Sequence, residues 1–528
     1  MKEEIMRMGM VSSSPVQEWV EPSEAGHWAS GRFGKVITPH NINYLVRYGR
    51  ISLNSDGFVS LKELEAYYLR REESLKSQCA SLGQDVDWEL SFSEIKEKET
   101  TKHVHRLHPY KGKFIPQLVQ HFVRKYLPPG TVLLDPFCGS GTTLVQANEE
   151  GMHAVGVDIC GFNTLLSQVK TRKLDLALCR REFRSLSHRL AKHTFHSPTY
   201  RFDREIKDRL QEFNRRYFPL PEFRIRVQKK EIDEKTYART HLKQWLLIYE
   251  DLLRRHNIVP HEATDSSFLL KWYPPNMREE IRILKEGILG IKDKGLREIA
   301  MVVLSRTLRS CRATRHEDLA TLKEAITGPY YCKKHGKICR PLLSMEGWWR
   351  RYTEDTLQRL DIFDGLRSPT EQTCLQGDAR NIDLLAQLQE INPLLGTKIK
   401  KEGLRGIFTS PPYVGMINYH EQHAYAYETF DIERRDEEEI SPLFRGKGKV
   451  AQESYTESIS QVLRHCKQYL SKDFDAFIVA NDKHNLYPNI IEKSGMHLQK
   501  IYHRPVLNRT EKDRSPYTES IFHLVRCG

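Results

Sequence analysis

Residues 131–158 constrain the fold of this chain more than any other stretch of its sequence. They read as TVLLD, a short apolar strand, PFCGSG, a tight turn, TTLVQANEEG, a helix, and HAVGVD, a second apolar strand that ends in an acid. A strand, a crossover helix and a second strand make the repeating unit of doubly wound parallel sheets, whose ligands bind at the carboxyl ends of the strands. We therefore expect an α/β fold with a binding site at the glycine turn.

The alternation of strands and helices resumes in the last third of the chain. Further apolar strands are expected at 373–378, 403–408 and 474–482, and a terminal β-hairpin at 498–507 and 519–526. Between the two parts, residues 161–370 carry the helical period almost throughout. The simplest architecture is a doubly wound, mostly parallel sheet with a terminal hairpin, interrupted by a largely helical insertion.

A chain of 528 residues is long enough for two or three domains, and we divide this one into four segments. Residues 1–100 form an appended N-terminal module of unknown role, in which 61–83 are expected to form one amphipathic helix. Residues 101–160 and 371–528 form the two parts of the α/β domain, and residues 161–370 form the helical insertion.

The insertion also carries the positive charge of the chain. The full sequence has 82 Lys and Arg against 69 Asp and Glu, a net charge of +13. Residues 161–370 hold 43 of these basic and 27 of these acidic residues, so the remainder of the chain is slightly acidic. A segment with this excess is suited to the phosphate backbone of a nucleic acid.

Composition argues against several other classes of protein. The mean hydropathy is −0.58, and no apolar run approaches the ~20 residues that a membrane span needs. The first residues lack the apolar core and cleavage site of a secretory signal. Ten cysteines without a paired framework are typical of a reducing compartment, so we expect a cytoplasmic protein with no membrane partner.

The glycine turn and the acid that follows it form a candidate cofactor site. Gly139 and Gly141 let the backbone approach a ligand closely, and the helix start after them offers free N–H groups. Asp158 ends the second strand, where a carboxylate can accept hydrogen bonds from ribose hydroxyls. A P-loop would need Lys and then Ser or Thr after its last glycine, and a dinucleotide site would need a third glycine where Leu144 stands.

DPFCGSGTT at 135–143 resembles the cofactor loop of S-adenosylmethionine-dependent amino-methyltransferases that act on DNA. HPYKGKFIP at 108–116 is similar to the segment that closes over the methionine end of the cofactor in that family, and GDAR at 377–380 to the segment whose acid meets the adenine amine. The resemblance implies S-adenosylmethionine as the cofactor and a seven-stranded sheet with a reversed last strand. The cofactor-binding residues that it implies are Lys113, Phe114, Pro116, Asp135, Pro136, Phe137, Gly139, Ser140, Gly141, Thr142, Asp158, Asp378 and Thr409.

TSPPY at 409–413 resembles the catalytic motif of the same family, in the S-P-P-Y form associated with the N4 amine of cytosine. The resemblance implies a catalytic role for Ser410, Pro411, Pro412 and Tyr413. The lone pair of an exocyclic amine is delocalised into the ring, and acceptors such as Ser410 Oγ and the Pro411 carbonyl would stabilise the positive charge that develops on it. Tyr413 would stack on a base flipped out of the helix.

The expected function is therefore methylation of cytosine N4 at specific sites in double-stranded DNA, with the target base flipped. The resemblance implies a modification enzyme of a restriction-modification system, paired in function with a separate restriction endonuclease. Three alternatives stay open: an adenine-N6 DNA methyltransferase, an RNA guanine-N2 methyltransferase and a catalytically inactive DNA-binding accessory protein. Methylation at cytosine C5 is disfavoured, because it uses a cysteine that follows a proline and none of the ten cysteines does so.

Aromatic residues after the catalytic motif have two interpretations. Tyr419 next to Asn418 and His420, and then Tyr425, Tyr427 and Phe430, either line a pocket for the base or form the core side of a helix.

A cysteine- and histidine-rich stretch, YYCKKHGKIC, also has two interpretations. Cys332, His335 and Cys339 could bind zinc if Cys311 or His316 supplied a fourth ligand. The sequence favours the other interpretation, a basic loop with buried free thiols. The sequence alone therefore assigns no metal site.

Overall fold

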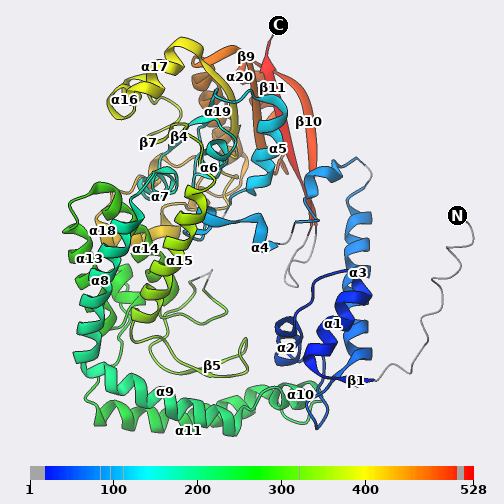
Figure 1. The fold of residues 1–528 in the computed structure, drawn as a ribbon, viewed down its shortest axis with the longest axis vertical. Helices are drawn as coiled ribbons and strands as arrows, with labels where there is room; N and C mark the ends of the chain where they lie inside the picture. Colours follow the sequence, from blue (N-terminus) through cyan, green and yellow to red (C-terminus); the bar gives the residue numbers. More distant parts are fainter. Residues whose placement is uncertain are drawn as a thin grey trace, which may run out of the picture. The chain divides into compact units, whose positions relative to one another are not determined.

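The computed structural model describes residues 18–527 except 84, 96, 111, 320–321 and 508–515 (Figure 1). The chain divides into two compact units. The first unit contains residues 1–81, 204–252 and 329–339, and the second contains 82–203, 253–328 and 340–528.

A seven-stranded sheet forms the centre of the second unit (Figure 1). Its strand order is β10-β11-β9-β8-β3-β4-β7. The strands are β3 (Val132–Asp135), β4 (His153–Asp158), β7 (Gln372–Gln376), β8 (Leu404–Thr409), β9 (Leu470–Ala480), β10 (Met496–Val506) and β11 (Tyr517–Arg526). Only β11 runs in the direction opposite to the other strands of the sheet, so the predicted mostly parallel sheet with a terminal hairpin is confirmed.

The two faces of the sheet bury alternate residues of each strand, because successive side chains of a strand point to opposite sides. On one face, Leu133 packs in a core with α5 (Pro116–Tyr126) and α6 (Thr142–Glu149). On the other face, Leu134 packs in a core with four helices. These helices are α16 (Leu384–Ile391), α17 (Pro393–Glu402), α19 (Lys449–Lys467) and α20 (Tyr487–Ser494).

A third core joins helices of the insertion to the second unit. It is built by six helices: α7 (Gly161–Thr171), α8 (Leu176–His196), α13 (Pro275–Leu289), α14 (Lys294–Cys311), α15 (Glu346–Asp364) and α18 (Ala424–Phe430). The short helix α12 (Phe268–Trp272) also contributes to this core. Most of the insertion therefore belongs to the second unit, where its helices pack against α18 of the C-terminal segment.

The first unit combines the N-terminal segment with the middle of the insertion. Its N-terminal helices are α1 (Pro22–Phe33), α2 (Pro39–Arg47) and α3 (Leu61–Ser81), and β1 (Trp19–Val20) pairs with β2 (Val59–Ser60). The insertion adds the C-terminal part of α9 (Pro198–Tyr217), α10 (Glu222–Gln228), most of α11 (Glu234–Arg255) and a hairpin of β5 (Tyr330–Cys332) and β6 (Lys337–Cys339). The predicted helix at 61–83 is present as α3, where the backbone N–H of Glu63 donates to the side chain of Ser60 at 3.3 Å.

These compact units follow different boundaries from the four segments expected from the sequence. Residues 1–81 share a unit with 204–252 and 329–339, whereas 82–100 belong to the α/β unit. The reason is that only residues 204–252 and 329–339 of the insertion belong to the first unit. The helices on either side of them share a core with α18 in the second unit. As functional divisions, the four segments stay predictions. Within the described ranges, no helix is both long and apolar enough to cross a membrane.

The central strand provides a test of the packing. Leu134 on β3 is fully buried, and we expect Leu134→Ala to lower the free energy of unfolding by about 2–5 kcal/mol, because it removes buried methyl groups and leaves a cavity. Leu394 on α17 is 76% exposed, so Leu394→Ala should change this free energy by less than about 0.5 kcal/mol. Urea denaturation of the full chain measures both, and equal losses would contradict this packing.

Candidate active site

A cavity opens at the carboxyl ends of β3, β4, β7 and β8, all within the second unit. It encloses about 790 Å³, including solvent at its mouth, which suits a small-molecule ligand. Eleven of the residues singled out in the sequence line it: Lys113, Phe114, Pro136, Phe137, Gly139, Ser140, Thr142, Asp158, Asp378, Ser410 and Pro412. Six others do not line it: Pro116, Asp135, Gly141, Thr409, Pro411 and Tyr413. Parallel strands bring these distant segments together because their carboxyl ends meet at one edge of the sheet.

The turn after β3 is held in a conformation that requires its glycines. Gly139 and Gly141 have φ angles of +52° and +75°, in the region that favours glycine. A Cβ on Gly139 would lie 3.0 Å from the hydroxyl of Tyr110, and one on Gly141 would lie 2.9 Å from Ser167 Oγ. Ser167 also donates to the carbonyl of Gly139 at 3.0 Å. The turn is therefore packed from both sides by side chains.

Two buried polar atoms of residues that line the cavity have no hydrogen-bond partner among the described residues. The buried Ser140 Oγ and Asn163 Oδ1 both belong to residues of its lining. A buried polar atom without a hydrogen bond costs about 1–3 kcal/mol, so such atoms in a pocket indicate a polar ligand. Lys113, which donates to the carbonyl of His105 at 3.0 Å, lines the same cavity, and burial lowers the pKa of its ammonium to about 8.

Asp158 at the end of β4 is buried and hydrogen-bonded. Its Oδ2 accepts from the backbone N–H of Gly139 at 2.7 Å, and its Oδ1 accepts from the backbone N–H of Cys160 at 2.9 Å and from Asn163 Nδ2 at 3.1 Å. The Asn163 amide also donates to Tyr110 Oη at 3.3 Å. Burial raises the pKa of Asp158 to about 6, although these hydrogen bonds favour the charged form.

Asp135 and Thr409 lie behind the cavity and connect its two principal loops. Thr409 Oγ1, at the end of β8, donates to Asp135 Oδ1, at the end of β3, at 2.6 Å. The same oxygen accepts from the backbone N–H of Phe137 at 3.2 Å. Both side chains are buried, so this contact fixes the glycine turn relative to the loop after β8.

The loop after β8 presents Ser410 and Pro412 to the cavity, whereas Pro411 is buried. The half-buried Tyr413 lies outside the lining. Burial raises the pKa of this phenol above its ordinary value. Ser410 is therefore the residue of this turn whose polar side chain lies at the cavity.

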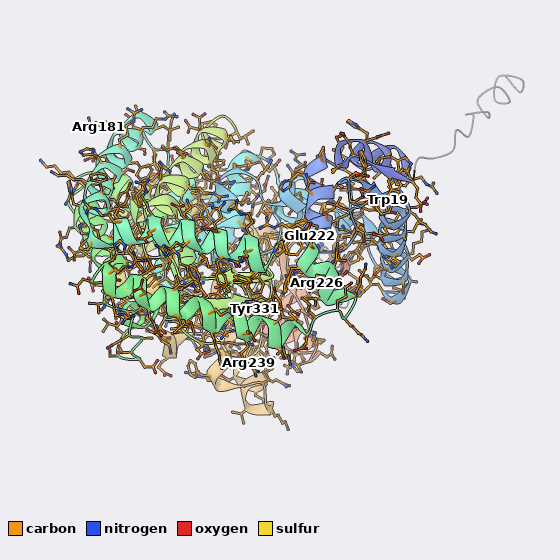
Figure 2. The ribbon with its side chains drawn as sticks, turned by 90° about the horizontal axis from the view of Figure 1, so that it is seen from below. Trp19, Arg181, Glu222, Arg226, Arg239 and Tyr331 are labelled. Atoms are coloured by element: carbon orange, nitrogen blue, oxygen red, sulfur yellow. The ribbon has the colours of Figure 1, made fainter. Side chains whose placement is uncertain are left out.

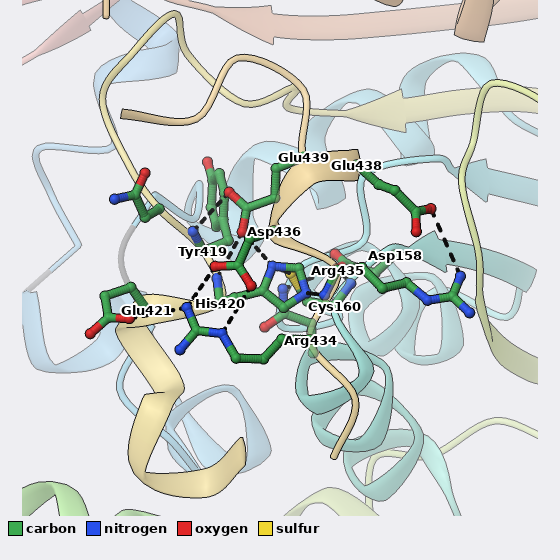
Figure 3. A network of polar contacts seen from close by, with 12 residues as sticks. Asp158, Cys160, Tyr419, His420, Glu421, Arg434, Arg435, Asp436, Glu438 and Glu439 are labelled. Carbon is green, nitrogen blue, oxygen red and sulfur yellow. Dashed lines mark hydrogen bonds and ion pairs between the residues drawn. The ribbon is translucent and has the colours of Figure 1, made fainter. Parts of the chain in front are cut away.

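Residues 438–440 also line the cavity and were not among the predicted site residues; Figure 3 shows the polar contacts around them. Glu439 accepts from the backbone N–H groups of Tyr419 at 3.1 Å and His420 at 2.9 Å, and it pairs with the His420 ring. On the other side, Arg380 binds the Asp378 carboxylate, with contacts from 2.5 to 2.9 Å, and donates to the carbonyl of Glu438 at 3.1 Å. The acidic run DEEE at 436–439 is the one signal in the sequence that could have indicated them.

Of the aromatic residues after the catalytic motif, only Tyr419 lines the cavity. Tyr425, Tyr427 and Phe430 are buried in the core that α18 shares with the insertion helices. Their spacing therefore reflects the buried side of a helix. Tyr110 and Asn163 also line the cavity and were missing from the expected cofactor set, although Tyr110 lies in the HPYKGKFIP motif. Lys111 of that motif is outside the described residues.

The buried acid between the two loops should make stability depend on pH. Burial raises the pKa of Asp135 to about 6, from an ordinary value near ~4. Between these values the folded chain binds the proton that the unfolded chain has released, so the contribution of Asp135 to the free energy of unfolding falls as pH rises. Relative to Asp135→Asn, the wild type should lose up to about 3 kcal/mol between pH 4 and pH 7. Urea denaturation at a series of pH values tests this expectation, and parallel curves for the two proteins would contradict it.

Comparisons with known proteins agree with this site. Residues 57–161, which include the glycine turn and Asp158, match the family model described as N6_N4_Mtase, DNA methylase. The chain is 42% identical over 518 residues to the type II methyltransferase M.MjaII of Methanocaldococcus jannaschii, covering 97% of both chains. It is also 29% identical over 140 residues to the type II methyltransferase M.MvaI of Kocuria varians, covering 26% of this chain and 30% of the relative.

Among solved structures, the rRNA methyltransferase aviRa of Streptomyces viridochromogenes aligns with 80% of this chain and 88% of its own, at 11% identity. The TM-score of this alignment is 0.26, which is too low to support a conclusion about the fold of this chain. The relationship to M.MjaII spans nearly the whole of both chains. The chain therefore belongs to the DNA amino-methyltransferases of restriction-modification systems, and its methyl donor is S-adenosylmethionine.

Proposed function

We propose that this DNA methyltransferase acts on the N4 amine of cytosine in double-stranded DNA. The observation that carries the proposal is Ser410, which stands at the cavity in the S-P-P-Y form of the catalytic turn. A serine at this position accepts a hydrogen bond without carrying a charge, whereas the aspartate of the D-P-P-Y form goes more often with adenine N6. Adenine N6 is therefore the second candidate.

The residues of the cavity suit S-adenosylmethionine in three respects. The carboxylate of Asp158 is placed to accept hydrogen bonds from the ribose hydroxyls, in addition to those it accepts from the protein. The Ser140 hydroxyl and Lys113 offer donors to the carboxylate of the methionine moiety. Asp378 lines the cavity, and its carboxylate is bound by Arg380. This carboxylate would therefore bind the adenine amine and the Arg380 guanidinium at the same time.

The cofactor supplies an electrophilic methyl group on a sulfonium, and the protein's part in the transfer is to position the amine and to stabilise its charge. Ser410 Oγ and the carbonyl of Pro411 accept hydrogen bonds from the two amine hydrogens and favour its nucleophilic form. The two prolines restrict φ and remove backbone donors, so the turn is rigid and presents carbonyl oxygens. Tyr413 follows in the same turn and offers a ring against which a flipped base stacks.

The identity of the product tests the proposal directly. The purified chain is incubated with labelled S-adenosylmethionine and duplex DNA, the DNA is digested to nucleosides, and the methylated nucleoside is identified by mass. N4-methyldeoxycytidine supports the proposal. N6-methyldeoxyadenosine overturns the base assignment, and methylation of tRNA alone, as N2-methylguanosine, overturns the substrate.

Two variants should separate cofactor binding from methyl transfer. Asp158→Ala removes a charged acceptor, and we expect it to weaken binding of S-adenosylhomocysteine by about 10- to 100-fold, because hydrogen bonds to charged groups contribute about 1.5–3 kcal/mol. Ser410→Ala should lower the single-turnover rate by about 100-fold or more and leave that affinity unchanged. Calorimetric titration and rapid-quench kinetics measure the two effects. Equal cofactor affinity in Asp158→Ala and the wild type would contradict the ribose role.

We also propose that the basic insertion binds the DNA backbone while a few of its side chains read base edges. In the part of the insertion that belongs to the first unit, Arg226, Lys229, Lys230 and Arg239 are exposed (Figure 2 labels Arg226 and Arg239). Exposed Lys and Arg side chains displace counterions from phosphates, so binding through them falls steeply with salt.

Neutralising one lysine pair tests this assignment. Lys229→Gln with Lys230→Gln should weaken binding to duplexes of any sequence, and should reduce the slope of log affinity against log salt by about one for each phosphate that the pair neutralises in the wild type. Lys400→Gln with Lys401→Gln is a matched control, because this exposed adjacent pair lies at the end of α17, outside the insertion. Fluorescence anisotropy over a salt series measures both, and equal effects of the two double variants would contradict the assignment.

A further inference from the structure

The hairpin of β5 and β6 brings together the cysteines and the histidine of CKKHGKIC, within the first unit. The strands pair Cys332 with Lys337 and Tyr330 with Cys339, so the two cysteines are diagonal neighbours on one face of the ribbon. His335 lies in the turn between them, where the backbone N–H groups of His335 and Gly336 donate to the carbonyl of Cys332 at 3.1 and 2.7 Å. The turn closes through Gly336, whose φ is +61°.

The donor atoms of these three residues are close enough for one ion. The sulfurs of Cys332 and Cys339 and a ring nitrogen of His335 lie within 4.8 Å of one another, and Cys339 Sγ is 3.5 Å from His335 Nδ1. Zinc with thiolate and imidazole ligands has bonds of about 2.0–2.3 Å, which place such atoms at this separation around the ion. Both cysteines are buried, and His335 is half-buried.

Neighbouring side chains hold the hairpin in this shape from outside. Asn214 on α9 donates to the carbonyl of Ile338 and accepts from its backbone N–H, both at 2.9 Å. Arg224 on α10 donates to the carbonyls of Lys333 and Lys334 at 2.5 and 3.0 Å. Because these contacts hold the backbone, the three donor side chains are pre-organised.

The hairpin itself is too small to be stable on its own. Each strand has three residues, and an isolated two-stranded hairpin is marginal in water even when it is longer. The hairpin also carries Lys333, Lys334 and Lys337, whose charges repel one another. A cation bound by thiolates offsets both costs, because metal binding contributes directly to folding.

We propose that Cys332, His335 and Cys339 bind a structural Zn²⁺ ion that stabilises this hairpin. Two thiolates and an imidazole form a ligand set that zinc favours, and each thiol gives up its proton to solvent as it binds. A fourth ligand completes the tetrahedron. Neither Cys311 nor His316, the two fourth donors suggested by the sequence, belongs to the first unit, so the proposal rests on the three donors of the hairpin. It is independent of the methyl-transfer chemistry.

Metal content and cobalt spectroscopy of the full-length wild type test the proposal without any variant. The protein, purified with reductant and without chelator, should contain one zinc ion per chain by plasma mass spectrometry. Replacement of that ion by Co²⁺ should give sulfur-to-metal charge-transfer bands and the d–d bands of a tetrahedral site. Substoichiometric zinc after incubation with zinc salt, a cobalt spectrum without thiolate bands, or a Cys332–Cys339 disulfide found by mass spectrometry would each overturn it.

Variants then assign the ligands. Cys332→Ser, Cys339→Ser and His335→Ala should each lose the bound ion, whereas His335→Cys should retain it with a stronger charge-transfer band, because a third thiolate replaces the imidazole. Cys79 on α3 is the matched control: it is a half-buried cysteine of the same unit, and Cys79→Ser should keep one zinc per chain. Full zinc retention in Cys332→Ser and Cys339→Ser, or loss of zinc in His335→Cys, would contradict the assigned set.

Discussion

The buried hydrogen bond between Thr409 and Asp135 connects the two principal loops of the candidate active site. It joins residues 274 positions apart in the chain, at the carboxyl ends of two neighbouring parallel strands. One of these strands leads into the glycine turn and the other into the catalytic turn. The distance between the methyl donor and the amine therefore depends on a contact that touches neither. A displacement of about 1 Å between reacting groups can cost about a hundredfold in rate, so a short contact shielded from solvent suits this position.

The sheet makes this contact possible through its order and its packing. The strands that carry Asp135, Asp158 and Thr409 are adjacent at its centre, and each is buried on both faces. Helices on either side fix their positions along the strand direction. The functional loops are irregular, but they begin at fixed points, and their hydrogen bonds with Asp158 and Glu439 hold them in place.

Much of the fold was predictable, because strands buried on two faces read as short apolar runs. The strands at 131–135, 153–158 and 403–408 and the terminal hairpin all appear within a few residues of their expected places. The cavity lining was predictable where a local motif carries it, as at Gly139, Asp158 and Ser410. Asn163 and Glu439 were not, because they reach the cavity only through tertiary packing. The aromatic spacing at Tyr425 was ambiguous, since a buried helix face and a pocket wall have the same period.

The place at which the insertion leaves the sheet has a consequence for how such enzymes diversify. It leaves after β4 and returns at β7, and these two strands pair in register, from Ala154 with Gln372 to Asp158 with Gln376. β4 and β7 can therefore pair whatever the length of the insertion between them. The entropic cost of closing this insertion grows by only about 0.6 kcal/mol for each doubling of its length. The middle of the insertion, at 204–252, packs in the other compact unit. A lineage can exchange that part, and with it the DNA contacts proposed for it, without altering the strands that lead into the candidate site.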